Sequence, residues 1–180
     1  MIRLNTNMNQ RLPPYRAAAP AARALLHSHV DWLDQWPWHV AFTLDFRGGV
    51  HHAAAAETAR RFFHKLDCDA FGSTQVRKGR RLRRVCYRQG EAGLRNWHYH
   101  GAQALPHDPR CRFDQGVAGH AQAFGDFIMA RWRSEPLAGV HGQAKPIWDQ
   151  ARWLGYISRD AGWDGDSLDL TTTTLPRHCV

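Results

Sequence analysis

The chain has 180 residues, of which 43% are hydrophobic and eight are tryptophan, so it is long enough to form one domain with a sizeable core. Its 24 lysines and arginines outnumber its 16 acidic residues, and the formal charge of +8 favours a polyanionic partner, most simply a nucleic acid. The sequence has no apolar run of membrane-spanning length and no Walker-type phosphate-binding loop, which argues against a membrane protein and against an ATPase or helicase module.

Two features predict a cytoplasmic location. The first ten residues are polar and lack the apolar segment of a secretory signal peptide. Cys68, Cys86, Cys111 and Cys179 form no CxxC pair, so neither a zinc knuckle nor a disulfide framework is indicated. We therefore expect four reduced thiols.

The first part of the chain predicts an arm, a helix and a strand. Residues 1–20 are polar and contain three prolines, which favours a flexible arm, and residues 21–34 have helical spacing of apolar positions. Residues 38–46 alternate strictly between apolar and other side chains, with Thr43 and Asp45 on the less apolar face. This alternation predicts a half-buried strand.

The middle of the chain predicts a helix over residues 53–66, closed by Phe71-Gly72, and then a strongly basic run over residues 77–84. Six of these eight residues are cationic, a density expected for contacts with phosphates, although a solvated hairpin face is the alternative. The residues that we expect to bind DNA through this run are Arg77, Lys78, Arg80, Arg81, Arg83 and Arg84.

The remaining elements follow from the same patterns. Residues 85–89 and 97–105 predict an antiparallel hairpin joined by a glycine-containing turn. Further on, the pattern predicts a helix over 117–133, a short strand over 140–147 and a helix over 149–161 that begins at Asp149. Residues 164–180 are polar and rich in threonine, and we expect a weakly ordered tail after a single domain over residues 21–163.

The segment Trp97-His98-Tyr99-His100 carries the clearest chemical signal. On a strand, His98 and His100 project from one face, whereas Trp97 and Tyr99 project from the other, into a core. Two neighbouring imidazoles on a rigid strand can supply two nitrogen ligands to a divalent metal. The alternative is a pair of half-buried histidines without a ligand.

The last predicted helix carries a second signal at Tyr156. Helical spacing places Tyr156 on the polar side with Arg152 and Arg159, away from an apolar stripe that includes Trp153 and Leu154. A phenol flanked by guanidinium groups is easier to deprotonate and could act as a nucleophile, and the arginines could hold a phosphate. An amphipathic surface tyrosine is the alternative.

Three segments in this order resemble motifs of one family. Phe42-Thr43-Leu44-Asp45, then His98-Tyr99-His100, then Gly155-Tyr156-Ile157-Ser158-Arg159 are similar to motifs I, II and III of the HUH endonucleases. Within that superfamily the chain is most similar to single-tyrosine rolling-circle replication initiator (Rep) proteins. The resemblance spans roughly residues 38–163.

The resemblance implies both a fold and an activity. The fold is of the α+β class, a central antiparallel sheet with flanking helices, which the family packs on one face. The activity is nicking and joining of single-stranded DNA at an origin or hairpin. His98 and His100 would bind Mg²⁺ or Mn²⁺, and Tyr156 would form a 5′-phosphotyrosine bond. Because the chain has no ATPase motif, unwinding would come from elsewhere, such as a host helicase.

Two departures from the family pattern affect this interpretation. Many Rep proteins have a lysine three residues after the tyrosine, where this chain has Arg159, which can orient a phosphate but is a poor proton donor. No second tyrosine lies near Tyr156, so completing strand transfer would need a second protomer or attack by a 3′-hydroxyl.

The third metal ligand is left open among three residues. The family usually supplies a carboxylate or an amide from the strand before the two histidines. Gln89 and Glu91 have the same parity on that strand, and Glu91 is the better ligand for a hard cation, so we favour it. Asp45, on the first strand, is the weaker candidate.

Other functions remain possible on this sequence. The protein could be an HUH transposase or relaxase, a nucleic-acid-binding module that kept the fold without catalysis, or a metal-binding structural protein. In the DNA-binding interpretations, Trp36 or Trp148 could stack on unpaired bases.

Overall fold

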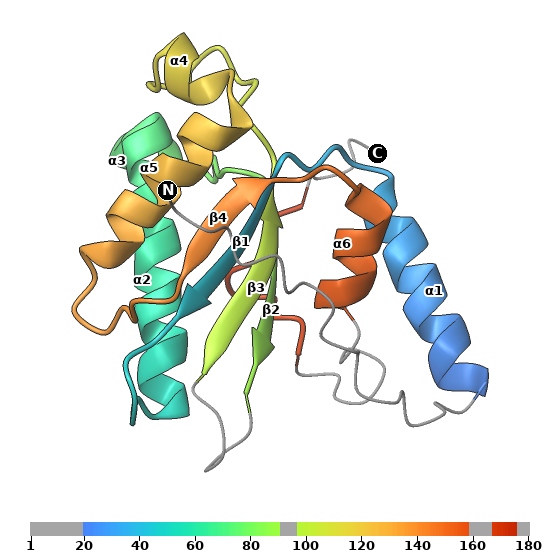
Figure 1. The fold of residues 1–180 in the computed structure, drawn as a ribbon. Helices are drawn as coiled ribbons and strands as arrows, with labels where there is room; N and C mark the ends of the chain where they lie inside the picture. Colours follow the sequence, from blue (N-terminus) through green and yellow to red (C-terminus); the bar gives the residue numbers. More distant parts are fainter. Residues whose placement is uncertain (1–19, 91–96, 159–166, 176–180) are drawn as a thin grey trace, which may run out of the picture.

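The computed structural model describes residues 20–90, 97–158 and 167–175, which form a four-stranded antiparallel sheet with helices packed against it (Figure 1). The strands are β1 (Val40–Asp45), β2 (Arg84–Gln89), β3 (His98–Gln103) and β4 (Gln143–Pro146), in the order β2-β3-β1-β4. This architecture confirms the α+β class and the predicted hairpin of β2 and β3.

Helices cover both faces of the sheet, whereas the family resemblance implied one covered face (Figure 1). The helices are α1 (Pro20–Asp34), α2 (His52–Phe71), α3 (Ser73–Arg77), α4 (Gln115–Ala118), α5 (Ala121–Arg133) and α6 (Gln150–Ile157). Helices α2 and α5 pack on one face, and α1 and α6 pack on the other. The expectation of a single covered face is therefore wrong, because the apolar sides of α1 and α6 share a second core.

The larger core follows from the alternation in β1. Val40, Phe42 and Leu44 are buried between the sheet and helices α2 and α5, and the residues between them are half-buried. Phe42 lies opposite Gly101 of β3. A Cβ atom on Gly101 would lie 2.2 Å from the Phe42 ring and 2.4 Å from the Val85 carbonyl oxygen, so only glycine fits at this position.

The smaller core holds α6 against the opposite face of the sheet. Leu154 and Ile157 of α6 pack with Tyr87 and Ala102 from the sheet and with Leu33 from α1. Polar contacts fix the same helix: Trp153 Nε1 donates to the Gly101 carbonyl at 3.1 Å, and Gln89 Nε2 donates to the Ile157 carbonyl at 3.3 Å. The helix that carries Tyr156 is thus anchored to β3 and β2.

Several element boundaries differ from the predictions. Helix α2 continues five residues beyond Leu66, because Ala70 and Phe71 are buried in the larger core despite the poor helix formers around them. The predicted helix over 117–133 is divided into α4 and α5 at Gly119. Helix α3, which holds Arg77 at the start of the basic run, was not predicted.

The predicted weakly ordered tail is wrong for residues 167–175, which run along the outer edge of β2. Arg84 N donates to the Thr174 carbonyl at 2.9 Å, and Asp169 N donates to the Cys86 carbonyl at 2.9 Å. The buried Asp169 also accepts a hydrogen bond from Tyr99 Oη at 2.9 Å. These backbone hydrogen bonds and the Tyr99 hydroxyl hold residues 167–175 against the sheet. The polar composition of the segment had suggested a weakly ordered tail.

Cys68, Cys86 and Cys111 are free thiols, and Cys179 lies outside the described residues. Burial raises the pKa of Cys86 to about 12, so this thiol stays protonated near neutral pH.

Within the described ranges, no helix combines the length and apolar character needed to cross a membrane.

Candidate active site

His98 and His100 project from the same face of β3, as predicted, and this face is the one that α6 covers. Their ring centroids are 4.7 Å apart. His100 is only 6% exposed, while His98 is half-buried. Tyr99 is fully buried on the opposite face, and Trp97 packs against the core there, which confirms the predicted division between the two faces.

Tyr156 lies beside His100, although 56 residues separate them in the chain. The ring centroids of Tyr156 and His100 are 5.3 Å apart, and Tyr156 also stacks on Trp153 at 5.4 Å. The expectation that Tyr156 lies on the polar side of its helix is therefore wrong: Tyr156 is half-buried and packs against the smaller core. The phenol thereby joins the histidine face of the sheet.

The two arginines predicted beside Tyr156 are only partly described. Arg152 is exposed on α6, one helical turn before Tyr156. Arg159 lies outside the described residues, so its predicted role stays a prediction. The helix itself begins as expected at Asp149, whose side chain accepts a hydrogen bond from Arg152 N at 3.0 Å.

Thr43 orients the imidazole of His100. The two residues are opposite one another in the β1–β3 pairing, and Thr43 Oγ1 is 2.9 Å from His100 Nδ1. When Nδ1–H donates to this hydroxyl, the lone pair of the ring lies on Nε2, the form in which histidine binds a metal. The alternation in residues 38–46 predicted that Thr43 lies on the less apolar face of β1. The pairing of β1 with β3 shows that its neighbour on β3 is His100.

Removing the Thr43 hydroxyl is expected to weaken the site without unfolding the protein. Partners that fix a ligating histidine are typically worth about 10- to 100-fold in metal affinity or activity, so Thr43→Val should lower Mn²⁺ affinity by that factor. Thr43→Ser keeps the hydroxyl and should bind Mn²⁺ nearly as tightly as the wild type. Isothermal titration calorimetry measures both, and equal affinities for the valine and serine variants would contradict this role.

Gln89, one of the three candidate third ligands, lies on the face of the sheet that carries the two histidines. It lies directly opposite His98 in the β2–β3 pairing, is 5% exposed, and its Oε1 atom has no hydrogen-bond partner among the described residues. A buried polar oxygen without a partner is costly, and a bound cation would satisfy it. Glu91, the ligand favoured from the sequence, lies outside the described residues.

Asp45 is also opposite His98, but its carboxylate is turned toward the loop before β4. Asp45 Oδ2 accepts a hydrogen bond from His141 N at 2.8 Å, and a Cβ atom on Gly142 would lie 2.8 Å from Oδ1. Among the residues that the structure describes, no three His, Cys, Asp or Glu side chains are grouped to hold a metal ion. Asp45 Oδ1, like Gln89 Oε1, is buried without a hydrogen-bond partner among the described residues, so both residues are candidates for the third ligand, and we favour Gln89 because the loop engages the other Asp45 oxygen.

Alanine variants of the two candidate ligands show whether Gln89 or Glu91 contributes to Mn²⁺ binding. If Gln89 completes the site, Gln89→Ala should weaken Mn²⁺ binding by about tenfold or more, by analogy with the loss of supporting residues around metals. Glu91→Ala is the matched control and should bind Mn²⁺ as the wild type does. Electron paramagnetic resonance of free Mn²⁺ measures both affinities. A loss confined to Glu91→Ala would reverse the assignment and restore the carboxylate that the sequence favoured.

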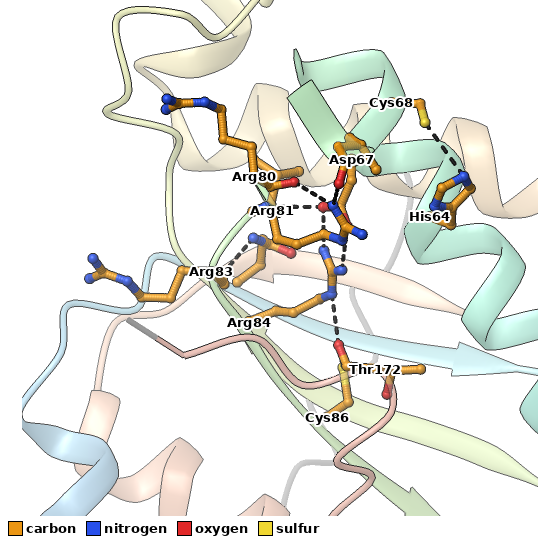
Figure 2. Close-up of polar contacts among 12 residues, drawn as sticks. His64, Asp67, Cys68, Arg80, Arg81, Arg83, Arg84, Cys86 and Thr172 are labelled. Carbon is orange, nitrogen blue, oxygen red and sulfur yellow. Dashed lines mark hydrogen bonds and ion pairs between the residues drawn. The ribbon is translucent and has the colours of Figure 1, made fainter. Parts of the chain in front are cut away.

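The basic run is divided between surface and interior, which corrects the expectation that all six cations face DNA (Figure 2). Arg84 is 3% exposed and forms two hydrogen bonds with the buried carboxylate of Asp67, at 2.8 and 2.7 Å. Arg81 pairs with Asp67 at 3.4 Å, and Arg80 pairs with Asp108. Arg84 is therefore a core residue, and its predicted contact with DNA is wrong.

The remaining cations of the run stay available to a polyanion. Arg77 and Lys78 are exposed, and Arg83 is half-buried with its guanidinium pointing away from Asp67 (Figure 2). The run leads into the start of β2, opposite Gln103, whereas His98 pairs with the last residue of β2. The five residue steps between His98 and Gln103 separate the two ends by about 17 Å. The basic run and the histidines thus lie at opposite ends of the sheet.

A buried hydrogen bond supports the histidine face from the side of α1. Tyr87, opposite His100 in the β2–β3 pairing, is fully buried, and its hydroxyl is hydrogen-bonded to His29 Nε2. Burial lowers the pKa of His29, which favours the neutral ring. No sequence pattern connects His29 with Tyr87, because the contact depends on how α1 packs.

Comparison with known proteins found no protein-family model, no curated protein and no solved structure that matches this chain.

Proposed function

We propose that this protein is a metal-dependent enzyme that nicks and joins single-stranded DNA through Tyr156, as rolling-circle replication initiators of the HUH type do. The observation that carries the proposal is the 5.3 Å approach of the Tyr156 ring to His100, on the face where His98 and Gln89 also lie. Three segments singled out for their order in the sequence are thus neighbours in space.

The proposed reaction is a transesterification. The Tyr156 phenol oxygen attacks the scissile phosphorus, its proton passes to water, and the bond from phosphorus to the 3′-oxygen breaks. The released 3′-oxygen takes up a proton and becomes a hydroxyl, while the 5′-phosphate remains on Tyr156. Attack by a 3′-hydroxyl on this phosphotyrosine reverses the chemistry and joins the strand.

His98, His100 and Gln89 would hold Mn²⁺ or Mg²⁺ beside this phosphate. The bound cation would supply positive charge to a non-bridging phosphate oxygen, where negative charge develops in the transition state. Imidazole nitrogens and an amide oxygen suit Mn²⁺, and the unpartnered Gln89 Oε1 atom is consistent with such a ligand. Thr43 supports the orientation of His100.

A non-catalytic nucleic-acid-binding module is the second candidate. It is favoured by the exposed Arg77 and Lys78, which lie at the end of the sheet away from the histidines and would bind DNA without them. An HUH transposase or relaxase would use the same chemistry in another setting. In each case we propose a cytoplasmic protein, and for a replication initiator we propose a separate helicase as partner.

A covalent-adduct assay tests the proposal. The protein is incubated with a labelled, degenerate pool of single-stranded oligonucleotides and Mn²⁺, and then separated on denaturing SDS gels. The expected result is a label at the combined mass of protein and DNA that disappears when EDTA is added. DNA binding without any adduct across the whole pool would favour the non-catalytic module instead.

A further inference from the structure

Trp148 is an exposed aromatic side chain beside the helix that carries the nucleophile. It is 92% exposed and lies between β4 and Asp149, the residue at which α6 begins. Tryptophan is usually buried to a large extent in folded proteins, so an indole this exposed presents an unusually large aromatic surface to another molecule.

The surroundings of Trp148 are cationic. Arg152 follows it by four residues on the exposed side of α6, and the Arg152 guanidinium has no ion-pair partner among the described residues. Asp149 is also exposed, but one of its carboxylate oxygens accepts the hydrogen bond that begins α6. An aromatic surface next to an exposed guanidinium is a combination that binds the bases and phosphates of single strands.

Trp148 lies next to the start of α6, at the end of the sheet that the basic run enters. Toward the nucleophile, Arg152 and Tyr156 are one helical turn apart on α6. Toward the basic run, Ile147 N donates to the His39 carbonyl at 2.8 Å, and Pro146 is in register with Arg84 through Val40 and Gln103. The Arg83 side chain has no ion-pair partner in the described part of the chain. Trp148 and Arg83 thus lie at the same end of the sheet, next to the ends of its two outer strands.

We propose that Trp148 is a base-stacking residue for single-stranded DNA that runs from Tyr156 along α6 toward Arg83. In this arrangement Arg152 contacts a backbone phosphate between the stacked base and the scissile phosphate. The inference rests on the proposed function, because Tyr156 fixes the end of the path. The six residue steps of α6 from Gln150 to Tyr156 correspond to about 9 Å, and Trp148 is two residues before Gln150, so the stacked base lies within a few nucleotides of the nick.

Binding measurements in a Tyr156→Phe background test this path without strand cleavage. The probe is a fluorescein-labelled oligothymidine, followed by fluorescence anisotropy. Trp148→Ala is expected to weaken binding by about tenfold, the scale found when one base-stacking aromatic is removed. Trp148→Phe should keep most of the affinity. Leu170→Ala, at an apolar side chain that is 75% exposed, is the matched control and should bind unchanged.

A second probe distinguishes stacking from a general effect of the variant. Replacing thymidines with abasic sites should weaken binding to the protein that retains Trp148, and should have little further effect on Trp148→Ala. If Trp148→Ala binds as tightly as Leu170→Ala while the otherwise wild-type enzyme still forms the covalent adduct, the inference is overturned and the proposed function stands. If neither binding nor adduct is found, both are overturned.

Discussion

Replacing Tyr156 with phenylalanine is expected to abolish the covalent protein–DNA adduct while leaving the fold and DNA binding intact. Only the phenol oxygen is removed, and the ring that stacks on Trp153 and contacts His100 remains. Loss of a nucleophile typically reduces turnover by roughly a factor of 10³ or more. The measurement is adduct formation with Mn²⁺ on SDS gels, together with circular dichroism to verify folding.

Tyr87→Phe is the matched control for this experiment. Tyr87 is on the same face of the sheet, opposite His100, but its hydroxyl is buried and hydrogen-bonded to His29. Burial raises the pKa of Tyr87, which makes its phenolate inaccessible near neutral pH. Tyr87→Phe should therefore still form the adduct. Adduct formation by Tyr156→Phe at the wild-type rate would remove Tyr156 from the mechanism.

Replacing Arg84 with methionine is expected to destabilise the protein by about 3 to 5 kcal/mol, because it leaves the Asp67 carboxylate buried without its main partner. Asp67 is fully buried, and both of its oxygens bind Arg84. Methionine preserves most of the side-chain volume above the Phe63 ring, over which the Arg84 guanidinium lies at 4.7 Å. Chemical denaturation monitored by circular dichroism measures the change.

A pair of the same type at the surface is the control for Arg84. Arg131 also forms two hydrogen bonds with one aspartate, Asp69, but its side chain is 49% exposed. Arg131→Met should therefore cost only about 0 to 1 kcal/mol. In the double variant Asp67→Leu/Arg84→Met, part of the lost stability should return, since no buried carboxylate remains, but the Leu82 amide loses its acceptor, Asp67 Oδ1. Equal losses for Arg84→Met and Arg131→Met would contradict this account.

The sequence predicted those features that depend on local periodicity. The alternation in residues 38–46 was sufficient to predict β1, and the spacing of His98 and His100 was sufficient to place them on one face. The order of helices and strands followed from the same patterns. These predictions succeed because side-chain direction repeats every two residues in a strand and every 3.6 in a helix.

Features that depend on contacts between distant segments could not be predicted. Arg84 was assigned to the surface because its neighbours are basic, whereas its partner Asp67 is 17 residues away on another element. The orientation of Tyr156 depends on how α6 packs over β3, and a helical pattern cannot specify this packing. The direction of the Asp45 carboxylate depends on a contact with His141, which is 96 residues away in the chain.

The segment over residues 167–175 has a consequence for how the protein meets other chains. An outer strand with unpaired backbone groups is a template for pairing with strands of other molecules. Here the outer side of β2 already pairs with this segment, and β4, on the other side, is only four residues long and contains Lys145 and Pro146. Both lateral borders of the sheet thus resist strand addition, which protects the protein from aggregation. A truncation that removes residues 167–175 should therefore uncover β2 and promote self-association.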